Sequence, residues 1–250
     1  MQNFFFVGTA ANIESTQWII SSLLKTKIMA TTKKTNSNFK TDPSLERVRE
    51  NAEEFGRAGK TSKFLRSIFR ELLVNVLGKE TSTRLTQLAY KVIQTDSVNA
   101  RGERTTNNGD VSLLKGFNFN HKARLSDLCC VRYQTTVDRA TGQVKIDIPS
   151  FVPRVLIQAP SKATHFRMQA AAAVLNFDSE QYEHVQQSTI DYDWTNIATE
   201  PTSLLLQLPA NSNGTIAVAM NIQFFERVNA VLYGFKSKAY NAAELIQVVK

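Results

Sequence analysis

Residues 215–225, which read TIAVAMNIQFF, decide the fold class of this chain. Large apolar side chains stand at every second position of this stretch, at Ile216, Val218, Met220, Ile222 and Phe224. Because the side chains of a β-strand alternate between its two faces, this period of two predicts a strand with one face in a core. The stretch is also long enough to cross a whole sheet.

The same period recurs in the residues before this strand. Alternation over residues 131–137, a turn-forming run at 138–142 and renewed alternation over 144–148 predict a β-hairpin. Further alternating runs lie at 166–172 and 204–208, and prolines separate the runs, at Pro149, Pro153, Pro160, Pro201 and Pro209. We therefore expect an antiparallel β-sandwich-like domain over residues 111–250.

The period changes to that of an α-helix in residues 41–95. The run Thr41-Asp42-Pro43 is a helix start signal, and apolar residues then recur at spacings of three and four until Gly56. Two further amphipathic runs, at 61–77 and 80–94, predict two more helices. The sequence thus predicts an α+β fold with an N-terminal three-helix region, and it leaves open whether these helices pack on the sheet.

Two segments lack any period. Residues 96–110 are rich in Asn, Asp, Gly and Arg, and we expect a mobile basic loop that separates two domains. Residues 1–40 are expected to be a disordered or non-native extension. Within them Met29 opens a polar, basic run, so we expect translation to start there. The rival interpretation is that residues 1–28 are a poor export signal.

The net charge of +8 is concentrated in one segment, because residues 59–126 carry +7 whereas residues 127–250 carry −1. A field of this kind attracts polyanions and acidic surfaces. Four cations fall on the polar half of the second predicted helix and could meet phosphates along a nucleic acid: Lys60, Lys63, Arg66 and Arg70. Four more could extend this patch: Arg84, Lys91, Arg101 and Arg104. The alternatives are an ordinary solvated helix face, an acidic protein partner or a membrane surface.

Acidic residues gather in the β half, at Glu180, Glu183, Asp191 and Asp193. The last two lie on one face of a predicted strand, at a spacing that could hold calcium or act as an acid/base pair, although no glycine-bearing calcium loop surrounds them. Solvated strand residues are the simplest interpretation. A third interpretation is that this acidic strip contacts the basic helix of a second copy, head to tail.

No pattern typical of an active site or a metal site stands out. Cys129 and Cys130 are adjacent, and we expect two buried, reduced thiols in a cytoplasmic protein. The histidines, at positions 121, 165 and 184, lack the spacing of metal ligands. The sequence predicts no cofactor, no metal, no membrane span and no enzyme activity. A hydrolase that uses Asp191 and Asp193 is kept for contrast.

Three stretches together resemble a known group of proteins: residues 39–43 (FKTDP), residues 222–226 (IQFFE) and residues 241–243 (NAA). With the helical block between the first two, they resemble uncharacterised bacterial proteins that have a helical N-terminal part and a β-rich C-terminal part. The resemblance covers residues 40–250. It implies a layout of the chain and brings no activity with it.

The leading hypothesis is a non-enzymatic binding or self-assembly module, with a second copy of the chain or another protein as its partner. It rests on the long neutral strands and the opposite charges of the two halves. The alternative is a nucleic-acid-associated protein that binds the phosphate backbone through the basic helix without sequence preference.

Overall fold

The computed structural model describes residues 39–250, and the statements below concern these residues. The expected start at Met29 and nearly all of the expected extension over residues 1–40 lie outside this range. The described residues fall into two units, residues 39–49 and Glu50–Lys250. In the first unit, Asp42 caps a short 3₁₀ helix, η1 (Pro43–Leu45), by accepting a hydrogen bond of 2.9 Å from the N–H of Ser44. The predicted start signal is therefore confirmed.

Two long helices replace the three that the sequence predicts. Helix α2 (Glu46–Ile68) runs without a break through Gly56 and Gly59, where we expected two helices to meet. A glycine inside a helix costs only about 1 kcal/mol relative to alanine, and Ala58 and Leu65 on the same helix are fully buried. Helix α3 (Thr81–Gln94) lies where the third helix was expected.

The second predicted helix also ends early. Residues 69–76 form turns, and Asn75 takes a left-handed backbone conformation with a φ of 64°. Their apolar side chains are nevertheless buried: Phe69, Leu72, Leu73 and Val76. Apolar spacing alone therefore did not separate a helix from a buried run of turns, and the three-helix region is not confirmed. Three short helices follow: η2 (Val111–Leu114), α4 (Leu125–Leu128) and α5 (Pro153–Leu156).

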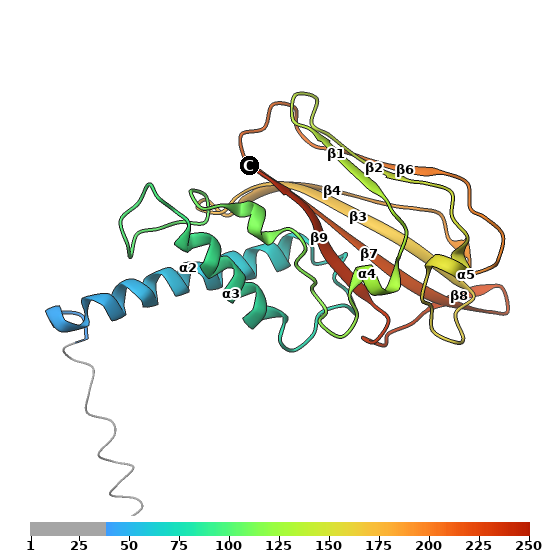
Figure 1. Cartoon of the computed structure of the whole chain (residues 1–250), viewed down its shortest axis with the longest axis horizontal. Coiled ribbons are helices and arrows are strands. Elements are labelled where there is room, and N and C mark those ends of the chain that lie inside the picture. Colours follow the sequence, from blue (N-terminus) through green and yellow to red (C-terminus); the bar gives the residue numbers. More distant parts are fainter. Residues whose placement is uncertain (1–38) are drawn as a thin grey trace, which may run out of the picture. The chain divides into compact units, whose positions relative to one another are not determined.

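The strands form two antiparallel sheets, which confirms the α+β class (Figure 1). The smaller sheet has the order β1-β2-β6. The larger has the order β4-β3-β7-β8, with β5 also paired to β3 and β9 also paired to β7. In chain order the strands are β1 (Gln134–Asp138), β2 (Gln143–Ile148), β3 (His165–Asn176), β4 (Gln181–Ser188), β5 (Tyr192–Asp193), β6 (Thr202–Gln207), β7 (Thr215–Val228), β8 (Val231–Gly234) and β9 (Ala242–Val249).

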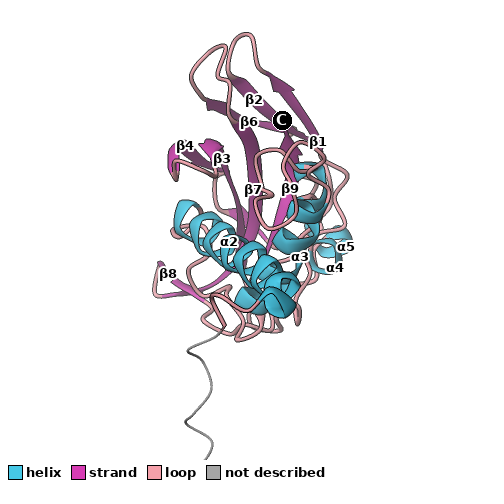
Figure 2. Ribbon diagram, turned by 90° about the vertical axis from the view of Figure 1, so that its left-hand side faces the viewer, coloured by secondary structure: helices cyan, strands magenta, loops and turns pink. Residues whose placement is uncertain are grey.

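The central strands β3 and β7 are buried on both faces. Their large alternating side chains, such as Met168 and Met220, pack against the smaller sheet. The small residues between them, such as Ala171 and Ala219, pack under α2, α3 and residues 69–76. Figure 2 shows α2 and the β1-β2-β6 sheet on opposite sides of β7 and β9. A two-sheet sandwich is therefore not confirmed, because helices cover the second face of the larger sheet.

The loop of residues 96–110 is bonded to α2 rather than free of it. The N–H of Gly102 donates to Oε1 of Glu54 at 2.9 Å, and the hydroxyls of Thr61 and Thr106 lie 2.7 Å apart. Asp96 organises the loop itself. Burial alone would raise the pKa of its carboxyl, but hydrogen bonds from Thr105, Asn99 and Val98 together lower this pKa to about 2. From Glu50 onward, the helices, this loop and both sheets belong to one compact unit.

Candidate protein-binding edge

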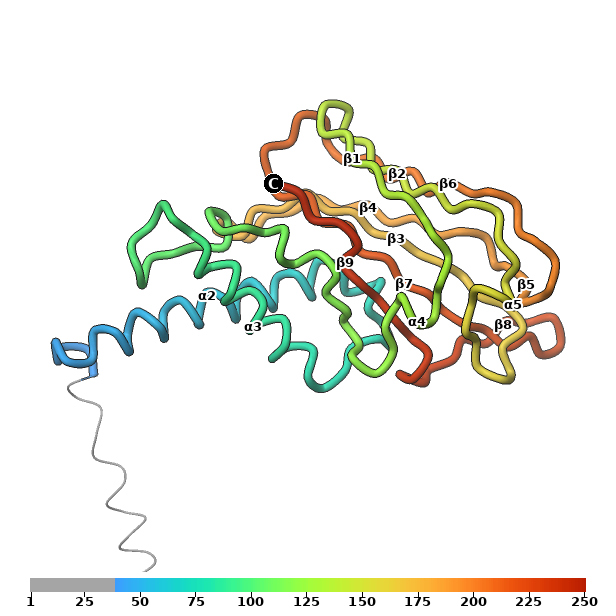
Figure 3. The backbone as a smooth tube through the Cα atoms, in the orientation of Figure 1, coloured from blue at the N-terminus to red at the C-terminus, as the bar shows by residue number. Residues whose placement is uncertain are grey.

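One edge of the larger sheet is covered where β9 forms it. Residues Gly116–Phe119 run along β9 and bond to it as an extra strand would: Gly116 N–H donates to Leu245 O at 2.8 Å, Leu245 N–H to Phe117 O at 3.0 Å and Phe119 N–H to Ala243 O at 2.9 Å. Phe117 and Phe119 are buried and pack edge to face. The chain can be followed in Figure 3 from α3 through this covering segment to α4.

The other edge of the larger sheet, β4, is open. This strand pairs with β3 alone, and within residues 39–250 no backbone hydrogen bond reaches the outer side of Gln181–Ser188. Every residue of β4 is exposed except Val185, which is half-buried against the core. A strand in this state presents unpaired N–H and C=O groups that can pair with another chain.

The β3–β4 hairpin is built by local bonds and one aromatic contact. Oδ1 of Asn176 accepts the N–H groups of Asp178 and Ser179, and Glu180 takes a left-handed φ of 53° as the chain reverses. Tyr182 then packs edge to face on Phe64 of α2, with ring centroids 5.7 Å apart. The helix thus holds the open strand in place without covering its edge.

Glu183, Val185 and Gln187 form a row on the face of β4 that looks toward the smaller sheet. Strand β6 approaches this row, and the N–H of Leu205 donates to Oε1 of Gln187 at 2.6 Å. Within the described residues the amide NH₂ of Gln187 and the carboxylate of Glu183 form no hydrogen bond or ion pair, as the bonds found for residues 39–250 show. One donor and one acceptor therefore stand free in the same row.

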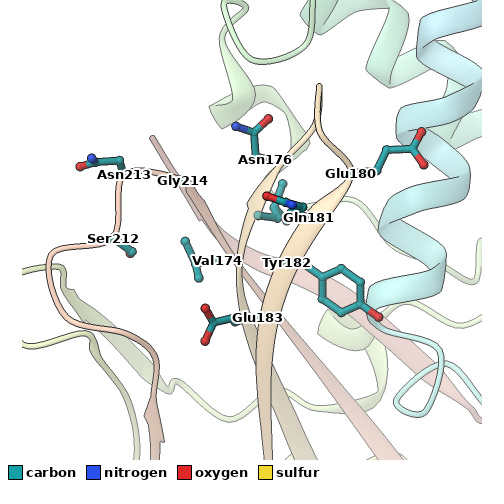
Figure 4. A pocket seen from close by; sticks show the side chains of 10 residues that line it. Val174, Asn176, Glu180, Gln181, Tyr182, Glu183, Ser212, Asn213 and Gly214 are labelled. Carbon is teal, nitrogen blue, oxygen red and sulfur yellow. The ribbon is translucent and has the colours of Figure 1, made fainter.

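A shallow hollow of about 640 Å³ opens beside Glu183. Figure 4 shows Val174 and Glu183 on the side toward Ser212, with Tyr182 and Glu180 on the side of the helix. Its far wall is residues 212–214, which Arg139 holds by donating to the carbonyl oxygens of Ser212 and Gly214. Among the described residues the buried hydroxyl of Ser212 has no hydrogen-bond partner. The gap between the two sheets is thus bridged at Gln187 and open at Glu183.

The predicted acidic strip is split into two parts. Asp191 forms a two-bond ion pair with Arg167, both bonds being 2.7 Å, and Oδ1 of Asp193 lies 2.7 Å from Nε2 of the buried His165. These pairs arise because β5 lies beside the start of β3. Glu180 and Glu183 have no ion pair within residues 39–250 and border the hollow.

The predicted basic residues fall into a free set and an occupied set. Lys60, Lys63 and Arg66 lie on α2, and Arg70 follows its end. Within the described chain Lys60, Lys63 and Arg70 are exposed and have no ion pair, whereas Nε of Arg66 donates to the carbonyl of Ser62 in its own helix.

Three of the four expected extensions of this patch are engaged elsewhere. Arg84 donates to Asn118 O and lies over the ring of Phe117. Arg101 lies 3.4 Å from Glu50, and Arg104 lies 4.0 Å from Glu54. Lys91 is exposed on α3. The structure therefore does not bring the eight cations together as one free patch.

The cysteines and histidines differ in their burial and in their neighbours. Cys129 is buried, and this burial raises the pKa of its thiol to about 11, but Cys130 is exposed, so the prediction of two buried thiols is wrong for Cys130. His121 lies 3.7 Å from Glu80, and His184 packs against Tyr182. Among residues 39–250, no group of three or more His, Cys, Asp or Glu side chains is placed to hold a metal ion.

In the same part of the chain, no helix has both the length and the apolar character needed to cross a membrane.

Sequence reasoning missed the strand that forms the open edge. Residues 181–188 read QYEHVQQS and show no alternation, because both faces of β4 are largely exposed. The available signal was the turn-forming run 176–180, directly after the alternating residues of β3.

Comparisons with protein-family models, with curated proteins and with solved structures give no match for this chain.

Proposed function

We propose that the protein is a non-enzymatic self-assembly module and that the edge of β4 is its docking surface. The observation that supports this proposal best is the contrast between two edge strands of one sheet, because Gly116–Phe119 covers β9 whereas β4 is open over the whole of Gln181–Ser188. Strand addition at an open edge supplies backbone hydrogen bonds as its main source of affinity.

Sedimentation velocity of the full chain over a wide concentration range tests this proposal. Backbone pairing predicts an oligomer that persists in high salt. A head-to-tail contact between the basic helix and acids of a neighbour would weaken steeply with salt. A strict monomer at every concentration and salt would contradict the proposal.

A pair of proline variants locates the contact. Successive N–H groups of an edge strand point alternately inward and outward, so one of Val185→Pro and Gln186→Pro removes an outward N–H and the other breaks a bond to β3. We expect the variant that keeps the wild-type melting temperature to lose assembly. Assembly that survives in this variant would remove β4 from the interface.

A second function is supported by the free cations of α2. Lys60, Lys63 and Arg70 form no ion pair within residues 39–250, so they are available to bind phosphates of a nucleic acid. The test is fluorescence anisotropy with generic DNA and RNA at low and physiological salt. Changing Lys60, Lys63, Arg66 and Arg70 together to Glu should abolish binding, whereas the same change at Lys115, Lys122, Lys162 and Lys236 should weaken it less. Equal losses in the two variants would assign the binding to net charge alone.

A further inference from the structure

The open edge of β4 carries a pattern that is complementary to itself. Two copies of an edge strand can pair around a twofold axis perpendicular to the sheet. Each face of one strand then lies on the same side of the joined sheet as the same face of the other strand. Residues that oppose each other must then belong to the same face, so the two position numbers add to an even total. Two such registers pair nearly the whole strand, one centred on His184 and the other on Val185.

The two registers differ in what they place opposite Glu183. The register centred on His184 puts the carboxylate of Glu183 against the apolar side chain of Val185 in the other copy. The register centred on Val185 puts Glu183 opposite Gln187 in the other copy, and Val185 opposite itself. Only the second register pairs this free carboxylate with a side chain that has a free donor, so the second register is favoured.

The hydrogen bonds already present in one chain fit this second register. Oε1 of Gln187 is occupied by the N–H of Leu205 at 2.6 Å, which leaves the NH₂ group of Gln187 as a donor. Glu183 faces the hollow beside Ser212 and has no partner within the described residues (Figure 4). Directly opposed residues of an antiparallel pair have Cβ atoms about 4.5–5.5 Å apart, which is within reach of a hydrogen bond between these two side chains.

We propose that the partner at this edge is a second copy of the same chain, joined through β4 in the register centred on Val185, with the amide of Gln187 donating to the carboxylate of Glu183 across the dimer. The contact occurs twice because the axis relates the two copies. This inference rests on the proposed self-assembly through β4 and adds the partner and the register.

The test is the dimer dissociation constant of full-length variants, measured by sedimentation velocity. Gln187→Glu keeps the acceptor for Leu205 but places two carboxylates opposite each other at both symmetric contacts. Along its own strand the new carboxylate is about 13 Å from Glu183, so repulsion within one chain is weak. We expect dimer affinity to fall at least tenfold. The double variant Glu183→Lys with Gln187→Glu should restore affinity to within about threefold of wild type, because opposite charges then face each other.

Gln181→Glu is the matched control, since it adds the same charge to the same face of β4 but meets no acid in the proposed register. Its affinity should equal that of the wild type. If wild type dimerises through β4 and Gln187→Glu does not weaken the dimer, the register is wrong and the self-assembly proposal stands. A failure of the double variant to recover also overturns the register. If wild type is a monomer throughout, both proposals fall.

Discussion

The edge strands β9 and β4 of the larger sheet differ in how the hydrogen bonds of their outer N–H and C=O groups are satisfied. At β9 the chain does so itself, with the segment Gly116–Phe119 bonded alongside and two phenylalanine rings buried beneath it. At β4 the outer row of N–H and C=O groups has no such cover within residues 39–250. Folded proteins usually protect sheet edges against pairing with other chains. The long edge left open at β4, in a sheet whose β9 edge is covered, is therefore a candidate docking surface.

The side chains of the two edges follow the same division. The covering segment of β9 is anchored by aromatic residues, whereas β4 is a polar strand in which only Val185 is half-buried. A polar open edge resists unspecific aggregation and still offers its backbone to a matched partner. Single substitutions near β9 and β4 test whether the first edge serves stability and the second serves docking.

The largest effect is expected at the covered edge. Phe119→Ala removes a fully buried ring beside β9 and should lower the free energy of unfolding by about 3–5 kcal/mol. Tyr182→Ala, at the open edge, removes a partly exposed ring and should cost no more than about 1.5 kcal/mol. Urea unfolding of both variants at a concentration below assembly provides the comparison. Similar losses at the two sites would show that the edges do not differ in this way.

An intermediate effect is expected at two acids, Asp191 beside β3 and Glu183 on β4. Asp191→Asn breaks the two-bond ion pair with Arg167, which is only partly exposed, and should cost about 1–3 kcal/mol. Glu183→Gln changes an acid that has no partner within the described chain and should alter the stability of the monomer by no more than about 0.5 kcal/mol. Thermal unfolding of the dilute proteins measures both. A destabilised Glu183→Gln monomer would reveal an intramolecular role for this carboxylate.

The smallest effect is a pH-dependent one at the covered edge. Burial raises the pKa of Glu244 on β9, although a hydrogen bond with Asn118 partly opposes this rise. A raised pKa means that the ionised carboxyl lowers the stability of the fold, and this cost is absent below the unfolded pKa and grows as the pH rises through the folded pKa. Glu244→Gln should therefore be slightly more stable than wild type at pH 7 and equal to it at pH 3.

Unfolding midpoints across this pH range provide the measurement for Glu244→Gln. The exposed Glu200→Gln serves as the control and should show no such trend. A Glu244→Gln variant that is less stable at pH 7 would mean that the carboxylate stabilises the β9 edge in its ionised form.

The sequence predicted the strands whose faces differ in polarity. β7, β3, β6 and the hairpin β1–β2 all lie on alternating runs, and most large residues of these runs, such as Ile216 and Leu204, are buried. The sequence pattern did not predict β4 or β9, and the two reasons are opposite. β4 is exposed on both faces, and β9 is largely buried on both, so neither shows a period of two.

The candidate edge depends on contacts that no local pattern contains. The residues that cover β9 precede it by more than a hundred positions, and Arg167 finds Asp191 only because β5 returns beside β3. The sequence therefore groups the four acids into one strip, although Asp191 and Asp193 have partners within the chain. Local spacing located the helix start at Asp42 correctly, because a cap involves neighbours alone.

Amide hydrogen exchange as a function of protein concentration tests whether β4 is the docking edge and β9 is not. We expect the amide of Leu245 on β9 to be protected at every concentration. The outward amides of Gln181–Ser188 should exchange fast in dilute protein and become protected as assembly proceeds. Outward amides of β4 that exchange equally fast at all concentrations, while the protein assembles, would show that β4 is not the docking surface.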